Sequence, residues 1–250
     1  MKPLNPPTPT DDVSSSSKRK LSWPLLALLG FLLILLLFKG IPGYFSWSWP
    51  WMSAPKVSAI KPLKEIRNEG LALPGWEITE QQVIPLGGNK WSYQQLRGDW
   101  EKPIIIFLLS QNSSTNQPRV EWVDFNGFQH QFFDRWKTDS YRNKTWQVRN
   151  PDDPSQTLTV RSRFLRGWNS AQTYAIVQWY AWPTGGSAAP VDWFIADRKA
   201  QIAGDRAPWM AVSIMIPIEP LGDIEAEAED IAGSLVALVQ TTLMETAFQD

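Results

Sequence analysis

The chain has 250 residues, with 24 Lys and Arg against 25 Asp and Glu, one histidine and no cysteine. The absence of cysteine excludes disulfides, thiolate zinc sites, iron–sulfur clusters and a cysteine nucleophile. A formal charge of −1 argues against duplex DNA as a partner, and a single histidine offers little for a transition-metal site. We therefore expect no nucleic-acid partner, no metal and no cofactor.

The N-terminal region has the composition of a tail followed by a membrane anchor. Residues 1–20 are rich in Pro, Ser and Thr, which predicts a disordered tail, and they end in the basic triplet Lys18, Arg19 and Lys20. The following residues carry no charge up to Phe38, a length of roughly 27 Å as a helix. This pattern predicts a single transmembrane helix over 21–41. A cleaved signal peptide is the alternative, which the length of the run and the absence of a good cleavage site disfavour.

The basic triplet before the predicted span sets its orientation. By the positive-inside rule the tail is cytoplasmic and the C-terminal part is external, which predicts a single-pass protein of the plasma membrane with a periplasmic domain. The linker over 42–55 contains Trp47, Trp49 and Trp51 at alternate positions. These tryptophans resemble an interfacial aromatic belt, and a carbohydrate-stacking patch is the alternative.

Residues 56–250 are predicted to form one external α+β domain. Hydrophobic runs between turn signals predict strands over 76–86, 90–96 and 103–109. Two alternating segments, 157–165 and 173–182, predict a long hairpin, since their side chains divide between two faces with a period of two. The sheet is therefore expected to be mainly antiparallel.

The last third of the chain mixes helix and strand. A helix is predicted to open at Pro190 and to end at Gly204, and a strand follows over 208–218. The strongest helical pattern starts at Asp223 and predicts a long C-terminal amphipathic helix with acidic residues in its first turns. Spacings of three and four place the following side chains of the earlier helix near one face: Val191, Phe194, Ile195, Arg198 and Ile202.

Catalytic constellations are sparse in this sequence. His130 lies between aromatic residues with no Ser or Asp pattern beside it, and there is no nucleophile elbow. The glycine pairs lack the lysine and spacing of a phosphate loop. We therefore expect a non-enzymatic protein, and a hydrolase built on His130 and carboxylates is the rival hypothesis.

A segment rich in basic and aromatic residues covers 135–166. Its basic side chains are interleaved with Trp136, Tyr141 and Trp146, a mixture that could contact an anionic polysaccharide, lipid headgroups or an acidic protein surface. Neighbouring aspartates partly neutralise it, so a solvated face is the favoured interpretation.

Three segments of the domain carry a family resemblance: Gln178-Trp-Tyr-Ala-Trp-Pro183, then Trp193 to Gln201, then Arg206 to Ile218. Behind a single N-terminal anchor, they resemble the cyanobacterial exosortase-associated proteins, particularly the cyanoexosortase B system-associated type. The resemblance implies an accessory protein of a PEP-CTERM-type protein sorting system. Exosortases are polytopic membrane proteins that process C-terminal sorting signals with a cysteine nucleophile, which this chain lacks.

The resemblance implies a non-catalytic role beside the exosortase, its sorted substrates or nascent exopolysaccharide. Charged residues beside large aromatics in these segments suggest a partner-facing surface, with burial of the two tryptophans in the core as the alternative. The residues of the predicted surface are Trp193, Asp197, Arg198, Gln201, Arg206 and Trp209. The alternative function is a membrane-anchored carbohydrate-binding protein of exopolysaccharide assembly, with the abundant tryptophans as stacking platforms.

Overall fold

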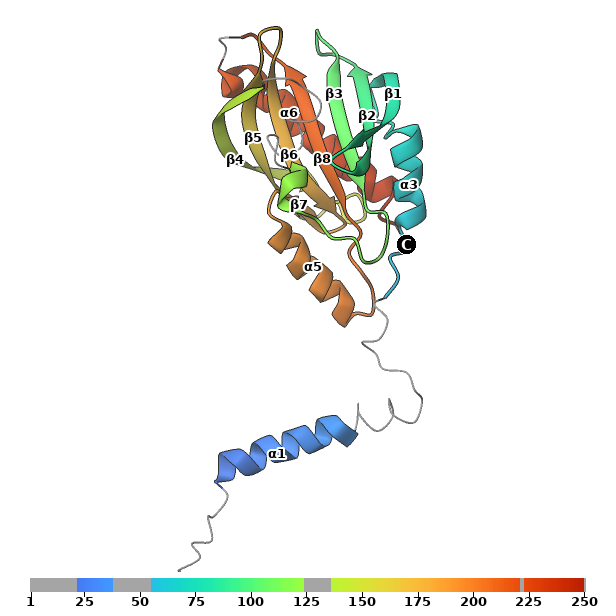
Figure 1. Cartoon of the computed structure of the whole chain (residues 1–250), viewed down its shortest axis with the longest axis vertical. Coiled ribbons are helices and arrows are strands. Elements are labelled where there is room, and N and C mark those ends of the chain that lie inside the picture. The colour runs from blue at the N-terminus through green and yellow to red at the C-terminus, as the bar shows by residue number, and fades with distance from the viewer. Residues whose placement is uncertain (1–21, 38–54, 124–135, 221–222, 250) are drawn as a thin grey trace, which may run out of the picture. The chain divides into compact units, whose positions relative to one another are not determined.

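The computed structural model describes residues 22–37, 55–123, 136–220 and 223–249, and the chain divides into two compact units, 1–53 and 54–250. Figure 1 shows the described helices and strands of both units. The first unit contains helix α1 (Trp23–Leu35), with Pro24 in its first turn. All its described side chains are exposed.

The prediction of a transmembrane helix over 21–41 is wrong for the described residues. Helix α1 has 13 residues, which at 1.5 Å per residue is about 20 Å, shorter than the ~30 Å hydrocarbon core. None of the helices that the structure describes is long and apolar enough to cross a membrane. The described α-helix covers 13 residues of the uncharged run.

The second unit begins with helix α3 (Ile60–Glu69), which buries Leu63 and Ile66 and which the sequence analysis did not predict. Three antiparallel strands follow: β1 (Glu77–Leu86), β2 (Asn89–Arg97) and β3 (Ile104–Ser110). They match the three strands predicted for this part of the chain. Gly87 and Gly88 form the turn between β1 and β2 with φ of 57° and 73°, a conformation that favours glycine.

A one-turn helix, η2 (Val120–Val123), leads to the described remainder of the sheet. Strand β4 (Lys137–Arg149) covers the basic aromatic segment, and β5 (Thr157–Trp168) and β6 (Thr173–Trp182) form the predicted hairpin. Short strand β7 (Gly185–Ser187) follows β6. The chain then continues through α5 (Pro190–Ile202), β8 (Met210–Pro217) and α6 (Ile224–Thr246).

The eight described strands form one sheet in the order β1-β2-β3-β8-β6-β7-β5-β4, with β5 also paired to β6. All pairs are antiparallel except β5 with β7. This confirms the predicted α+β class, the mainly antiparallel sheet and the long C-terminal helix. Asp223 caps α6, since its side chain accepts a hydrogen bond from the backbone N–H of Glu225 at 2.9 Å.

The two faces of the sheet bury different side chains. Helix α6 lies across one face, where aliphatic residues such as Val177 and Ile214 pack with Leu235 and Val239 of the helix (Figure 1). We call this packing the aliphatic core. The opposite face buries a cluster rich in aromatic side chains, which we call the aromatic core and which contains Phe107, Trp122, Tyr174, Tyr180, Trp182, Trp193 and Trp209.

Strand β6 contributes to both cores, and all ten of its residues are buried. Its alternation matches the prediction: Ile176 and Tyr180 lie in the aromatic core, and Val177 and Trp179 lie in the aliphatic core. Gln240 of α6 joins the helix to this strand, because its side chain accepts from the Trp179 indole at 3.3 Å and donates to the carbonyls of Trp182 and Gly185.

Candidate functional site

Helix α5 lies at one end of the sheet, with its first turn tied to β5 and β7 (Figure 1). Pro190 begins the helix, a position where its missing N–H costs nothing. The Ser187 hydroxyl donates to Asp192 Oδ2 at 2.5 Å and accepts from the backbone N–H of Ala189. Arg161 of β5 pairs with the same Asp192 oxygen at 2.8 Å. These contacts fix the start of the helix against the strands.

A buried ion pair joins the middle of α5 to the segment that follows the helix. Arg206 Nε lies 2.7 Å from Asp197 Oδ1, and the two side chains are only 5% and 3% exposed. The same Asp197 oxygen accepts from the backbone N–H of Ala207 at 3.0 Å, and Asp197 Oδ2 accepts from Gln201 at 2.7 Å. Since a buried carboxylate is stable only when paired and hydrogen-bonded, these contacts satisfy it fully.

The ion pair also reaches a distant loop. Arg206 Nη1 donates to the Ser114 carbonyl at 2.9 Å. Beside it, the Trp209 indole donates to the Asn116 carbonyl at 3.1 Å, and its ring stacks on Trp122 with centroids 5.4 Å apart. The loop after β3 is therefore held to the segment between α5 and β8 by polar contacts that join residues about ninety positions apart.

Between α5 and the end of the sheet lies a pocket of about 750 Å³. Its apolar wall comes from Trp182 and Pro183 after β6, Ile195 of α5, Pro208 before β8, and Phe248 near the C-terminus. The size is in the range of pockets that hold small ligands or a short stretch of a partner chain.

The polar side of this pocket carries both positively and negatively charged side chains. Arg161 and Asp192 neutralise each other there, and Arg206 is paired with Asp197 behind it. Lys199 and Asp205 also line the pocket and make no ion pair among the described residues. The pocket therefore offers one ammonium and one carboxylate to a ligand, beside an apolar wall, which suits recognition of a molecule with apolar and polar parts.

Four residues of the predicted partner surface are buried. Trp193 and Trp209 are 1% and 0% exposed and lie in the aromatic core, as the alternative interpretation held. Asp197 and Arg206 form the buried ion pair and cannot meet a partner without leaving it. Only Arg198 and Gln201 reach solvent, where the guanidinium donates to the Gln201 side chain at 2.9 Å. The six residues therefore do not form one exposed surface, and the four buried ones stabilise the packing of α5 and the segment that follows it.

The other predicted positions lie outside the described residues. These are the basic triplet Lys18, Arg19 and Lys20, the interfacial Trp47, Trp49 and Trp51, and His130. Among the residues that the structure does describe, no cluster of three or more His, Asp or Glu side chains is placed to hold a metal ion.

The strand period divides the basic aromatic segment between the two faces of the sheet. Lys144 points to the α6 side and contacts Glu225 and Glu229 at 2.7 and 2.9 Å, and these hydrogen bonds raise the pKa of Lys144. Arg166 forms a two-pronged pair with Asp139, with both contacts at 2.8 Å, and lowers the pKa of that carboxyl. Much of the basic charge is thus neutralised within the domain, which supports the solvated-face interpretation.

Sequence reasoning missed the pocket and the exposed side of α5. Residues that line the pocket come from β5, β6, α5 and the C-terminus, so no single motif marks it. One signal for α5 was present in the sequence. The helix carries large apolar residues on two sides, whereas packing against a sheet requires them on one side only.

No protein-family model, curated protein or solved structure matches this chain.

Proposed function

We propose that the chain is a non-catalytic accessory protein of an exosortase-type sorting system, acting at the outer face of the plasma membrane. Its partner is the polytopic exosortase or one of the proteins that this enzyme sorts. The observation that carries the proposal is that all three segments with the family resemblance meet at the pocket. Trp182 and Pro183 belong to the first segment, Lys199 to the second, and Arg206 and Pro208 to the third.

The surroundings of the pocket support a role in binding. The buried Asp197–Arg206 pair and the Trp193 indole, which donates to the Ala207 carbonyl at 3.0 Å, hold α5 and the following loop in one arrangement. A wall fixed before the partner arrives loses little conformational freedom on binding, which favours affinity. The role is proposed as non-catalytic because the sorting reaction requires a cysteine that the chain does not contain.

The test is a pull-down of the tagged full-length protein from detergent-solubilised membranes, with partners identified by mass spectrometry. Lys199→Glu reverses the charge of a side chain that lines the pocket and leaves the buried Asp197–Arg206 pair intact. The matched control is Lys64→Glu, which makes the same change at an exposed position of α3. We expect recovery of an exosortase or a sorted protein with the parent chain and with Lys64→Glu, and at least a tenfold loss with Lys199→Glu. Recovery of neither partner class by the parent chain would refute the proposal.

Carbohydrate binding through stacked tryptophans has less support than the accessory role in the described domain. Every tryptophan from Trp76 to Trp209 is buried or partly buried, and none is exposed as a stacking platform needs to be. We therefore do not adopt this alternative for the domain.

A further inference from the structure

Helix α5 exposes a row of large apolar side chains on the side that faces away from the domain. Trp193, Ala196 and Ala200 pack against the aromatic core. The following side chains are exposed instead: Val191 (59%), Phe194 (42%), Ile195 (49%) and Ile202 (89%). We call these four residues the outer stripe; Ile195, at its edge, also borders the pocket between α5 and the sheet. Elsewhere in the described part of the domain, the exposed large hydrophobic residues Val83, Val120 and Tyr141 lie singly on different elements.

The geometry of a helix gathers the outer stripe on one side. With 100° of rotation per residue, positions 191, 194, 195 and 202 fall within an arc of about 100°, opposite Trp193 and Ala200. Burial of one apolar side already stabilises α5 on the sheet, and a second apolar side that faces water adds no stability to the domain. Large apolar side chains exposed together on one side of a helix are typical of an interaction surface.

Two cations accompany the outer stripe. Arg198 lies within the same arc, and its guanidinium carbon is 4.8 Å from the centre of the Phe194 ring. Lys199 lies at the margin of the stripe. Neither residue forms an ion pair among the described residues, and the arc itself carries no acidic side chain. The surface that covers the stripe should therefore be apolar and bear negative charge.

A second copy of the chain fits this requirement poorly. Two-fold pairing of α5 with its copy would bring the Arg198 cations of the two chains close together. An acidic lipid surface fits better, since apolar side chains enter the boundary of the acyl chains while Arg and Lys extend to the headgroup phosphates.

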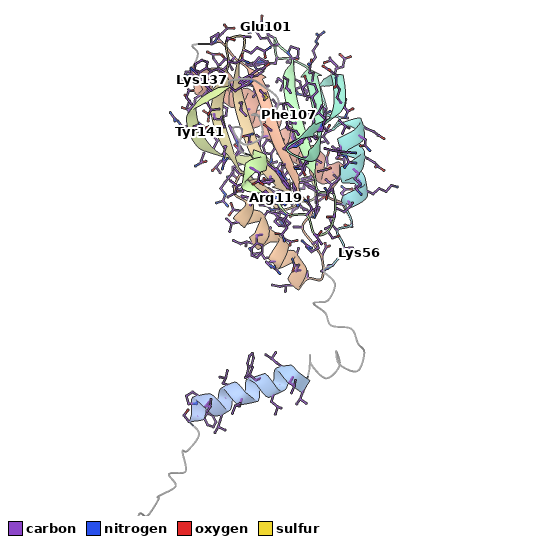
Figure 2. All side chains as sticks on the ribbon, viewed as in Figure 1. Lys56, Glu101, Phe107, Arg119, Lys137 and Tyr141 are labelled. Atoms are coloured by element: carbon purple, nitrogen blue, oxygen red, sulfur yellow. The ribbon has the colours of Figure 1, made fainter. Side chains whose placement is uncertain are left out.

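The domain's described start lies at the same end of the molecule. Figure 2 shows Lys56 close to the end of the domain where α5 lies, and Glu101 at the opposite end. The backbone N–H of Val57 donates to the Ser114 hydroxyl, and the Ser114 carbonyl accepts from Arg206 beneath α5.

We propose that the outer stripe of α5 docks the domain on an acidic lipid surface, with Arg198 and Lys199 at the headgroups. Ile195 and Lys199 at the edge of the stripe also line the pocket, so the contact is tested on vesicles of pure lipid, where no exosortase is present and a failure bears on lipid docking alone.

The absence of native cysteine allows a direct test with the full chain. Single variants Ile202→Cys and Val83→Cys, each labelled with a polarity-sensitive fluorophore, are bound to vesicles of phosphatidylglycerol and phosphatidylcholine, and binding is verified by flotation. We expect the label at 202 to shift to shorter wavelength and to be quenched by nitroxide-bearing lipids, and the label at 83 to remain in water. A label at 202 that stays in water on vesicle-bound protein would overturn the proposal.

The role of charge is tested in the same system. The double variant Arg198→Gln/Lys199→Gln, carrying the label at 202, should lower the ratio of docked to undocked domain by about thirtyfold, since each basic residue near an acidic membrane contributes about a factor of five. The label at 202 should be quenched less on vesicles of phosphatidylcholine alone than on vesicles that contain phosphatidylglycerol. Equal quenching on both kinds of vesicle, in the parent chain and in the double variant alike, would overturn the preference for acidic lipid. Shielding of the label only after solubilised membrane proteins are added would assign the stripe to a protein partner and overturn lipid docking.

Discussion

The two faces of the sheet are stabilised in different ways. Under α6 the aliphatic core is built mainly from Val, Ile, Leu and Ala side chains, which pack without directional demands. The aromatic core depends on hydrogen bonds as well: the indoles of Trp193 and Trp209 and the Tyr180 hydroxyl each donate to a backbone carbonyl. The aliphatic face should therefore tolerate changes of shape, and the aromatic face should respond sharply to the loss of a polar partner.

The largest effect is expected from breaking the buried ion pair. Arg206→Ala leaves the Asp197 carboxylate buried without its cation, so we expect a loss of about 3–5 kcal/mol in the free energy of unfolding. Chemical denaturation of the variant and of the parent chain measures this loss. Arg198→Ala, which removes an exposed guanidinium of the same helix, is the control and should change stability by less than about 0.5 kcal/mol.

If Arg206→Ala cost no more than its control, the contrast between the two faces would fail. A further check is the double variant Asp197→Leu/Arg206→Met, which removes both charges together. It should be more stable than Arg206→Ala alone, because no unpaired charge remains buried.

A polar contact within the aliphatic core gives an intermediate effect. Gln240→Leu removes the acceptor of the Trp179 indole and the donor to the carbonyls of Trp182 and Gly185, all within the buried interior. We expect a loss of about 2–3 kcal/mol, since these groups lose their partners away from water. On the same face, Ile214→Val leaves every polar group paired and should cost about 1 kcal/mol. Thermal unfolding of both variants would show whether the order holds.

The smallest effect is expected at the edge of the sheet. Arg166 lowers the pKa of Asp139 from its usual value of 3.8, so the pair stabilises the fold above about pH 4 and this contribution is lost as the pH falls through the lowered pKa. The Asp139 side chain is 43% exposed, so solvent screening limits the contribution to less than about 1 kcal/mol. Asp139→Asn should be slightly less stable at pH 7, and its difference from the parent chain should shrink as the pH falls below 3.8 and Asp139 takes up a proton. A difference that did not shrink with falling pH would contradict this assignment.

The sequence predicted the parts of the fold that depend on a regular period. Alternation placed the side chains of β6 correctly on two faces, and the three-and-four spacing found α6 from its cap at Asp223. The same spacing grouped Val191, Phe194 and Ile202 on one side of α5. The spacing did not show that this side faces away from the core. Trp193, Ala196 and Ala200 form a second apolar side, and the sequence does not say which of the two sides packs against the sheet.

The candidate site was predicted only in part. Charged residues are usually exposed, so Asp197 and Arg206 were placed on a surface, and only the tertiary fold brings them within 2.7 Å of each other and out of water. The prediction of a transmembrane helix failed for another reason: it was made from an apolar run of 18 residues, whereas the described α-helix has 13.

The central position of β8 constrains the order of folding. β8 joins β3 to β6, although it comes almost last in the chain. Until residues 210–217 have been synthesised, β1 to β3 and β4 to β7 are two separate half-sheets, each with an unpaired apolar edge. Pairing across such a long separation in sequence is slow, and open edges invite aggregation. A nascent or truncated chain that stops before Met210 should therefore depend on chaperones. Once β8 is present, it can pair with both β3 and β6 and join the two half-sheets.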